Sequence, residues 1–226
     1  GSGAFADVLA GEYVFVPDGV PPSPVAFKVF KNSQALAPAM RESILAEAQL
    51  GLRLDHPHLI QLHGVLQIPQ RGLAIVLELA HGGSLRAILD NAAIALSWEV
   101  RLKWLIGISE GVSKLHSLSP RPVIHRDLKA ANVLLSSVDI ASAVPKVCDF
   151  GVATIMETMA TAMSGGGGMA GSLAWKAPET FRGTYSPASD VFSLAVIDFE
   201  VLTRQPPWVG VSLPEIDFNV KARFDP

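Results

Sequence analysis

One stretch of ten residues and one tripeptide place the strongest limits on what this 226-residue chain can fold into. Residues 123–132 read Val-Ile-His-Arg-Asp-Leu-Lys-Ala-Ala-Asn, and residues 149–151 read Asp-Phe-Gly. The first stretch places a carboxylate (Asp127), a cation (Lys129) and an amide (Asn132) within six positions, and the tripeptide adds a second carboxylate. This set of groups suits the transfer of a phosphoryl group from a metal-bound nucleotide to a hydroxyl.

Taken together, His-Arg-Asp-Leu-Lys-x-x-Asn and Asp-Phe-Gly resemble the catalytic and metal-binding loops of eukaryotic-type protein kinases. The resemblance implies that Asp127 is the catalytic base or the residue that orients the substrate hydroxyl, and that Lys129 contacts the γ-phosphate of ATP. It also implies that Asn132 and Asp149 bind magnesium, with two ions expected. Any one of these residues alone would more simply be a turn or cap residue, so the ordered set carries the prediction.

Composition excludes several other classes of function. The net charge is −3 and there is no basic run, so we expect neither nucleic acid nor a membrane surface as a partner of this segment. Cys148 is the single cysteine, which rules out an internal disulfide and favours a reducing, cytoplasmic compartment. No apolar stretch is long enough for a membrane-spanning helix. Membrane tethering through flanking regions and the oligomeric state stay open.

The order of expected elements predicts an α+β, two-lobed protein kinase-like fold. Strand patterns occupy 12–16, 25–30, 59–66 and 73–79, and helix patterns occupy 38–54, 97–116 and 189–203. We therefore expect one kinase domain over 1–226, with a small β-rich lobe that has one main helix (1–80) and a larger, mainly helical lobe (81–226). The chain stops before the last helices of such a domain, including the arginine that would pair with a buried Glu179, which predicts poor stability for this segment alone.

The N-terminal residues resemble the kinase glycine-rich loop, with Ala6 in place of the third glycine. An ordinary hairpin turn is the alternative, because two glycines are a weak signal. Glycines let backbone amides approach phosphate oxygens closely. The resemblance implies phosphate contacts at Gly1, Ser2, Gly3, Phe5 and Val8.

Lys28 lies in Val-Ala-Phe-Lys, which resembles the kinase strand whose lysine clamps the α- and β-phosphates. The alternative is a lysine at a strand edge in solvent. Glu47, in the expected helix 38–54, is the best partner for this lysine, with Glu42 as a more solvated competitor. Gly51 stands where the family packs an apolar side chain, so either a space is left there or a neighbour such as Leu50 fills it.

Residues 77–85 resemble the hinge that binds adenine. Backbone groups of Glu78 and Ala80 would bond the base, and Leu77 would guard the rear pocket. By itself the segment is a strand that ends in a glycine turn. Further nucleotide contacts are implied at Ala26, Ser84 and Leu134.

Two later segments agree with the family. Residues 171–179 resemble the segment ending in Ala-Pro-Glu that seats the substrate, and Asp190 begins what resembles the helix that anchors the catalytic loop. Arg126 implies control by phosphorylation of the activation segment. The candidate hydroxyls in that segment are Thr154, Thr158, Thr161, Ser164 and Ser172.

The sequence as a whole resembles the tyrosine-kinase-like group of serine/threonine kinases. The implied function is transfer of a phosphoryl group from ATP, with magnesium, to serine and threonine hydroxyls of protein substrates in signalling. The alternatives are a pseudokinase or scaffold that binds nucleotide or partners without turnover, and a kinase for small-molecule hydroxyls. The Ala-Pro-Glu segment speaks against the second alternative.

Overall fold

A computed structural model describes residues 6–13, 23–30, 42, 45, 48, 51–69, 72–150 and 170–224. The chain divides into two compact units, Gly1–Ala80 and His81–Pro226, and each is described by itself. Some predicted site residues lie outside the described residues, namely Gly1, Ser2, Gly3, Phe5, Glu47, Thr154, Thr158, Thr161 and Ser164.

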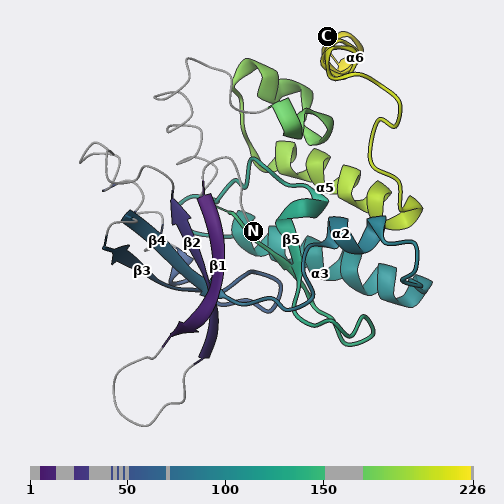
Figure 1. Cartoon of the computed structure of the whole chain (residues 1–226). Coiled ribbons are helices and arrows are strands. Elements are labelled where there is room, and N and C mark those ends of the chain that lie inside the picture. Colours follow the sequence, from purple (N-terminus) through teal and green to yellow (C-terminus); the bar gives the residue numbers. More distant parts are fainter. Residues whose placement is uncertain are drawn as a thin grey trace. The chain divides into compact units, whose positions relative to one another are not determined.

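The first unit contains a four-stranded antiparallel sheet with the order β1-β2-β4-β3 (Figure 1). The strands are β1 Ala6–Tyr13, β2 Ser23–Phe30, β3 Leu62–Ile68 and β4 Gly72–Glu78. The central strand β4 reads Gly-Leu-Ala-Ile-Val-Leu-Glu, and its first five residues are buried. A strand that packs on both faces needs such a continuous apolar run, and Ile75 and Phe30 at 2% and 0% exposure belong to the core that it forms.

Two of the expected strands are displaced. β1 begins at Ala6, not at residue 12, because an edge strand that pairs with only one neighbour needs little apolar patterning: Val8 and Leu9 are each 40% exposed. β3 begins at Leu62, not at residue 59. Leu59 and Ile60 are buried but precede the strand, and Leu59 forms only a single bridge.

The helix expected over 38–54 is helical at its described positions up to Gly51. The spacing of Ile44, Leu45, Ala48 and Leu52 predicts its apolar stripe, and part of this prediction is wrong. Ala48 is buried, whereas Leu45 and Leu52 are 42% and 43% exposed. Beside Gly51 there is no open space, because a Cβ at this position would lie 3.1 Å from Leu62 Cδ1. A side chain of β3 therefore fills the position for which we considered Leu50.

The second unit is mainly helical. Its elements are α2 Leu85–Asp90, α3 Trp98–His116, β5 Val133–Leu135, β6 Pro145–Val147, α5 Pro187–Thr203 and α6 Leu213–Phe224, with 3-10 helices η2 Ala130–Asn132, η3 Ala170–Trp175 and η4 Pro178–Arg182. β5 and β6 form an antiparallel hairpin. Among the described residues, no helix is both long enough and apolar enough to cross a membrane.

Helix α3 begins where its sequence predicts but buries a different face. Ser97 caps it, since the Ser97 Oγ accepts a hydrogen bond from the Val100 N–H at 3.3 Å. The apolar spacing predicts a buried stripe of Trp98, Leu102, Leu105, Ile106 and Ile108, which is confirmed at Ile108 but wrong for Trp98, Leu102 and Ile106, because these three side chains are 64%, 53% and 60% exposed. The buried stripe instead comprises Trp104, Gly107, Ile108, Gly111, Val112 and Leu115.

The strongly apolar sequence of residues 189–203 predicts a helix that is buried on most sides, and helix α5 is less enclosed than this. Its capping box at Ser186 and the proline at its first turn explain why the helix begins at Pro187. Val191, Phe199 and Leu202 are 55%, 47% and 37% exposed, so the prediction of burial on most sides is wrong for this structure. Glu179, expected to be buried without a partner, is half-exposed, which reduces the desolvation cost we anticipated.

Candidate active site

The loop that carries Asp127 is anchored by the first turn of α5. Asp190 is 1% exposed, and its Oδ2 and Oδ1 accept hydrogen bonds from the His125 N–H at 2.7 Å and the Arg126 N–H at 3.0 Å. The same Oδ2 lies 2.8 Å from His116 Nε2. A carboxylate at a helix N-terminus is favoured by the helix dipole, and here it fixes two consecutive backbone amides. The predicted anchoring of the catalytic loop by this helix is thus confirmed.

The β5–β6 hairpin joins the loop of Asp127 to the segment of Asp149. Val133 is paired with Val147 in the hairpin, and the Cys148 N–H donates to the Asn132 carbonyl at 2.9 Å. The fully buried His125 places its Nε2 2.8 Å from the Cys148 carbonyl oxygen. Asn132 directly precedes β5, and Asp149 lies two residues after the end of β6. The two predicted metal ligands are therefore both at the open end of this short hairpin.

Two residues of these loops adopt left-handed backbone conformations. The φ angle is 69° at Arg126 and 65° at Asp149. Each such conformation costs a non-glycine residue about 1 kcal/mol or more and persists only where surrounding contacts impose it. Strained residues beside candidate catalytic groups are typical of functional sites.

The side chains of Asp127, Lys129, Asn132 and Ser172 form one hydrogen-bonded cluster. Asp127 Oδ2 accepts from Lys129 Nζ at 2.8 Å and from Asn132 Nδ2 at 2.9 Å. The Asn132 amide also donates to the Asp127 carbonyl at 2.7 Å, and Lys129 Nζ donates to Ser172 Oγ at 2.8 Å. The sequence had brought the first three together, and the structure places them in direct contact.

The second carboxylate oxygen of Asp127 takes no part in this cluster. Asp127 Oδ1 is buried and has no hydrogen-bond partner among the described residues. A buried acceptor without a hydrogen bond raises the free energy of the folded protein. Such an atom in a native site therefore points to a substrate or ligand group that binds there. Because Oδ2 already takes two donors, Oδ1 is the oxygen placed to accept a hydrogen bond from a hydroxyl.

Ser172 was considered in the sequence only as one of five candidate phosphorylation sites. In the structure it is 8% exposed and its hydroxyl accepts from Lys129. Its contact with the catalytic loop was missed, because 43 positions separate it from Lys129. The available signal was its position six residues before Pro178 of the Ala-Pro-Glu motif.

The donor set at Asn132 and Asp149 fits a magnesium ion. The two hydrogen bonds that the Asn132 amide nitrogen donates to Asp127 orient the amide and leave its oxygen as an acceptor. Amide and carboxylate oxygens are suitable ligands for Mg²⁺, which keeps several waters and takes substrate phosphates as further ligands. No group of three or more His, Cys, Asp or Glu side chains that could hold a metal occurs in the described part of the chain.

In the first unit, Lys28 is 5% exposed, which contradicts the alternative of a solvated lysine at a strand edge. It lies on β2 opposite Val8 on β1 and Ile75 on β4. Ala26, two residues earlier and therefore on the same face, is 8% exposed and lies opposite Leu77. An ammonium group at a buried position of a sheet requires compensation by polar or anionic groups.

The predicted hinge residues lie at the end of β4 and at the start of α2. The Glu78 N–H donates to the Gln61 carbonyl at 2.8 Å, and Ala80 is half-buried. In the second unit, Ser84 caps α2 by accepting from the Ala87 N–H at 3.3 Å and forms an isolated bridge with the half-buried Leu134.

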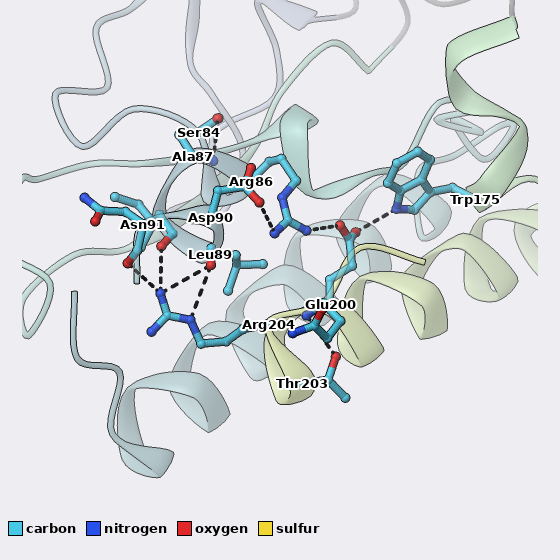
Figure 2. Close-up of polar contacts among 12 residues, drawn as sticks. Ser84, Arg86, Ala87, Leu89, Asp90, Asn91, Trp175, Glu200, Thr203 and Arg204 are labelled. Atoms are coloured by element: carbon cyan, nitrogen blue, oxygen red, sulfur yellow. Dashed lines mark hydrogen bonds and ion pairs between the residues drawn. The ribbon is translucent and has the colours of Figure 1, made fainter. Parts of the chain in front are cut away.

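A second polar cluster, which the sequence did not reveal, surrounds Glu200 on α5 (Figure 2). Glu200 is 0% exposed; its Oε1 accepts from Arg86 Nη1 at 2.6 Å and its Oε2 from Trp175 Nε1 at 2.7 Å. Arg86 also bonds Asp90 at 2.7 Å. Burial lowers the pKa of Arg86, but its hydrogen bonds to Asp90 and Glu200 and their charges outweigh this effect and raise the pKa.

Comparison with known proteins agrees with this geometry. A family profile described as "Protein tyrosine and serine/threonine kinase" matches residues 1–224. Mitogen-activated protein kinase kinase kinase 7 of Homo sapiens is 37% identical over 177 residues, which cover 77% of this chain and 27% of that protein. Mitogen-activated protein kinase kinase kinase 10 of Mus musculus is 34% identical over 202 residues, which cover 87% of this chain and 21% of that protein.

The chain thus spans less than a third of the length of these relatives. The comparisons confirm both the recognition of a eukaryotic-type protein kinase, most like the tyrosine-kinase-like group, and the predicted α+β kinase fold. The chain belongs to the protein tyrosine and serine/threonine kinase family.

Proposed function

We propose that this protein transfers the γ-phosphoryl group of ATP, with magnesium, to serine and threonine hydroxyls of protein substrates. The observation that carries the proposal is the buried, unpartnered Oδ1 of Asp127 next to Lys129 and Asn132. A carboxylate with one oxygen fixed and the other available matches the group that orients and deprotonates an incoming hydroxyl.

In the second unit, Asp127 Oδ1 accepts the hydrogen bond of the substrate hydroxyl and takes its proton. Lys129, held by Asp127 and Ser172, presents its positive charge to the γ-phosphate. Asn132 and Asp149 hold magnesium, which neutralises charge on the phosphates when bound. These groups act mainly by positioning and by charge stabilisation, which are the main contributions in phosphoryl transfer.

In the first unit, we assign the α- and β-phosphates to Lys28, with Glu47 as its partner, and the phosphate-binding loop to residues 1–8. The adenine contacts are assigned to the backbone at Glu78 and Ala80, with Ala26 and Leu77 lining the base. The burial of Lys28 and Ala26 on one face of β2 supports this assignment.

The two compact units support a division of one kinase domain into lobes 1–80 and 81–226. The names of the relatives support a role in a signalling cascade, and a cytoplasmic location is consistent with it. The serine/threonine preference rests on Lys129, which stands where tyrosine kinases have the Ala-Ala-Arg or Arg-Ala-Ala arrangement and whose ammonium donates to Asp127 and Ser172.

Analysis of the phosphorylated amino acids tests the acceptor class. The purified protein, incubated with γ-labelled ATP, magnesium and a mixed protein substrate such as casein, is expected to give phosphoserine and phosphothreonine after acid hydrolysis. Omitting magnesium is the control and should abolish the label. Phosphotyrosine as the main product would contradict the serine/threonine assignment, and ATP binding without transfer would favour a pseudokinase.

A further inference from the structure

Lys176 places a cation in the segment that ends in Ala-Pro-Glu, on a backbone that is fixed on both sides. Its own N–H donates to the Leu173 carbonyl at 3.2 Å. The carbonyl of Trp175, one residue earlier, accepts from Ser193 Oγ at 2.7 Å. Ala177, one residue later, is 1% exposed. The base of the Lys176 side chain therefore has a defined position, while the residue as a whole is only half-buried.

A second cation lies over the same aromatic ring as Lys176. Lys176 Nζ is 5.9 Å and Arg126 Cζ is 5.2 Å from the centre of the Tyr185 ring, and both distances are within the range of a cation–π interaction. Arg126 directly precedes Asp127, and its N–H is held by Asp190. The Tyr185 ring thus gathers two positive charges, one from the catalytic loop and one from the segment of Lys176.

The segment of Lys176 also contacts the residues assigned to the substrate hydroxyl. Ser172 accepts from Lys129 at 2.8 Å, and Lys129 donates to Asp127 at 2.8 Å. Ser172 belongs to the 3-10 helix η3, and Lys176 directly follows this helix, so the two residues are about 8 Å apart along it at the usual rise of about 2 Å per residue. An extended peptide spans this distance with about two to three residues. The Lys176 cation is therefore within reach of a substrate residue close to the acceptor serine or threonine.

We infer that Lys176, which shares the Tyr185 ring with Arg126, selects protein substrates that carry an anionic residue within about three positions of the acceptor hydroxyl. This inference rests on the proposed kinase function and names its substrate class. Two cations over one ring repel each other, and an anionic side chain beside them is attracted by both. Both cationic residues are half-buried, so salt screens this attraction less than it would on an open surface. The anion is a carboxylate or a phosphate, which share this chemistry.

Two peptides of fixed design test the charge preference without any transfer of phosphate. One fluorescein-labelled peptide of alanine and glycine has a single central serine with glutamates at the two positions on each side, and its twin has glutamines there. Fluorescence anisotropy, with a non-hydrolysable ATP analogue and magnesium present, should give a Kd about tenfold lower for the glutamate peptide, the usual gain from one charge-assisted contact. Equal Kd values for the two peptides, or no binding of either, would overturn the inference.

Substitutions at Lys176 assign the preference to this side chain. Lys176→Met keeps an unbranched side chain and removes the charge, so the ratio of the two Kd values should fall below about twofold. Lys176→Arg restores the charge, and its ratio should stay within about threefold of the wild-type ratio. Arg121→Gln removes an exposed cation elsewhere on the same unit and is the matched control, which should leave the ratio unchanged. A preference that persists in a Lys176→Met protein with wild-type melting contradicts the role of Lys176.

A third peptide separates the two sources of negative charge: it is the glutamine twin with phosphothreonine at the outer position on each side. Tighter binding than that of the glutamate peptide assigns the site to a phosphorylated residue, and binding between those of the twins assigns it to a carboxylate. The proposed function can fail separately. A wild-type protein that prefers the glutamate peptide but phosphorylates neither twin nor casein would contradict the kinase function alone, whereas transfer to both twins with equal kcat/KM and equal Kd would overturn the inference alone.

Discussion

Replacing Asp127 by asparagine is expected to lower kcat about a thousandfold, because general-base groups contribute roughly 10²–10⁴ in rate. The substitution preserves shape: the asparagine oxygen can take the place of Oδ2, which accepts from Lys129 and Asn132. The amide nitrogen then replaces the buried Oδ1, which loses its capacity to accept the substrate hydroxyl. ATP affinity should stay close to that of the wild type.

Steady-state phosphorylation and titration with a fluorescent ATP analogue measure the two quantities. Asp139→Asn, an exposed substitution in the loop between β5 and β6, is the control and should retain full activity. A kcat within about tenfold of the wild-type value in Asp127→Asn would contradict the role of Asp127, because such a loss is smaller than general-base catalysis normally supplies.

Replacing Gly82 by alanine is expected to destabilise the second unit by about 3 kcal/mol, at the upper end of the usual cost of overpacking. A Cβ at this position would lie 2.3 Å from the Ser137 carbonyl oxygen and 2.7 Å from Leu135 Cβ. These neighbours belong to the β5 end and to the loop after it, and the Gly82 N–H itself donates to the Leu135 carbonyl at 2.8 Å. The chain can therefore relieve the clash only by displacing the strand that follows the catalytic loop.

Gly83→Ala provides a matched comparison one residue away. Gly83 has a φ of 72° but open space around a Cβ, so the expected cost is about 1 kcal/mol from backbone strain alone. Urea unfolding followed by tryptophan fluorescence measures both variants, since Trp104 and Trp175 belong to this unit. Equal stabilities of the two variants would show that the close approach at Gly82 can be relaxed.

The catalytic cluster could be predicted because its chemistry is concentrated in a short stretch. Asp127, Lys129 and Asn132 are close in the sequence, so their mutual contact required little knowledge of the fold. Asp190 was also expected, since its position at the start of an apolar helix matches a family pattern. The division into a strand-rich first part and a helical second part followed from the change in hydrophobic period.

The Glu200 cluster could not be predicted, for a physical reason. Its three members come from α2, η3 and α5, and each of the residues Arg86, Trp175 and Glu200 would read as a surface or core residue in its own segment. The face of α3 was predicted wrongly for a related reason. The predicted stripe included Ile108 but not Trp104, and only tertiary packing selects the face with Trp104 over the face with Trp98 and Ile106.

The most direct test of the proposed function is the transfer of labelled γ-phosphate from ATP, with magnesium, to a generic serine/threonine substrate, beside an Asp149→Ala variant. We predict transfer by the wild-type protein and its loss in the variant, which lacks the carboxylate assigned to the metal. Transfer that persists in Asp149→Ala would contradict the assigned site. A wild-type protein that binds ATP but transfers no phosphate would contradict the kinase function itself.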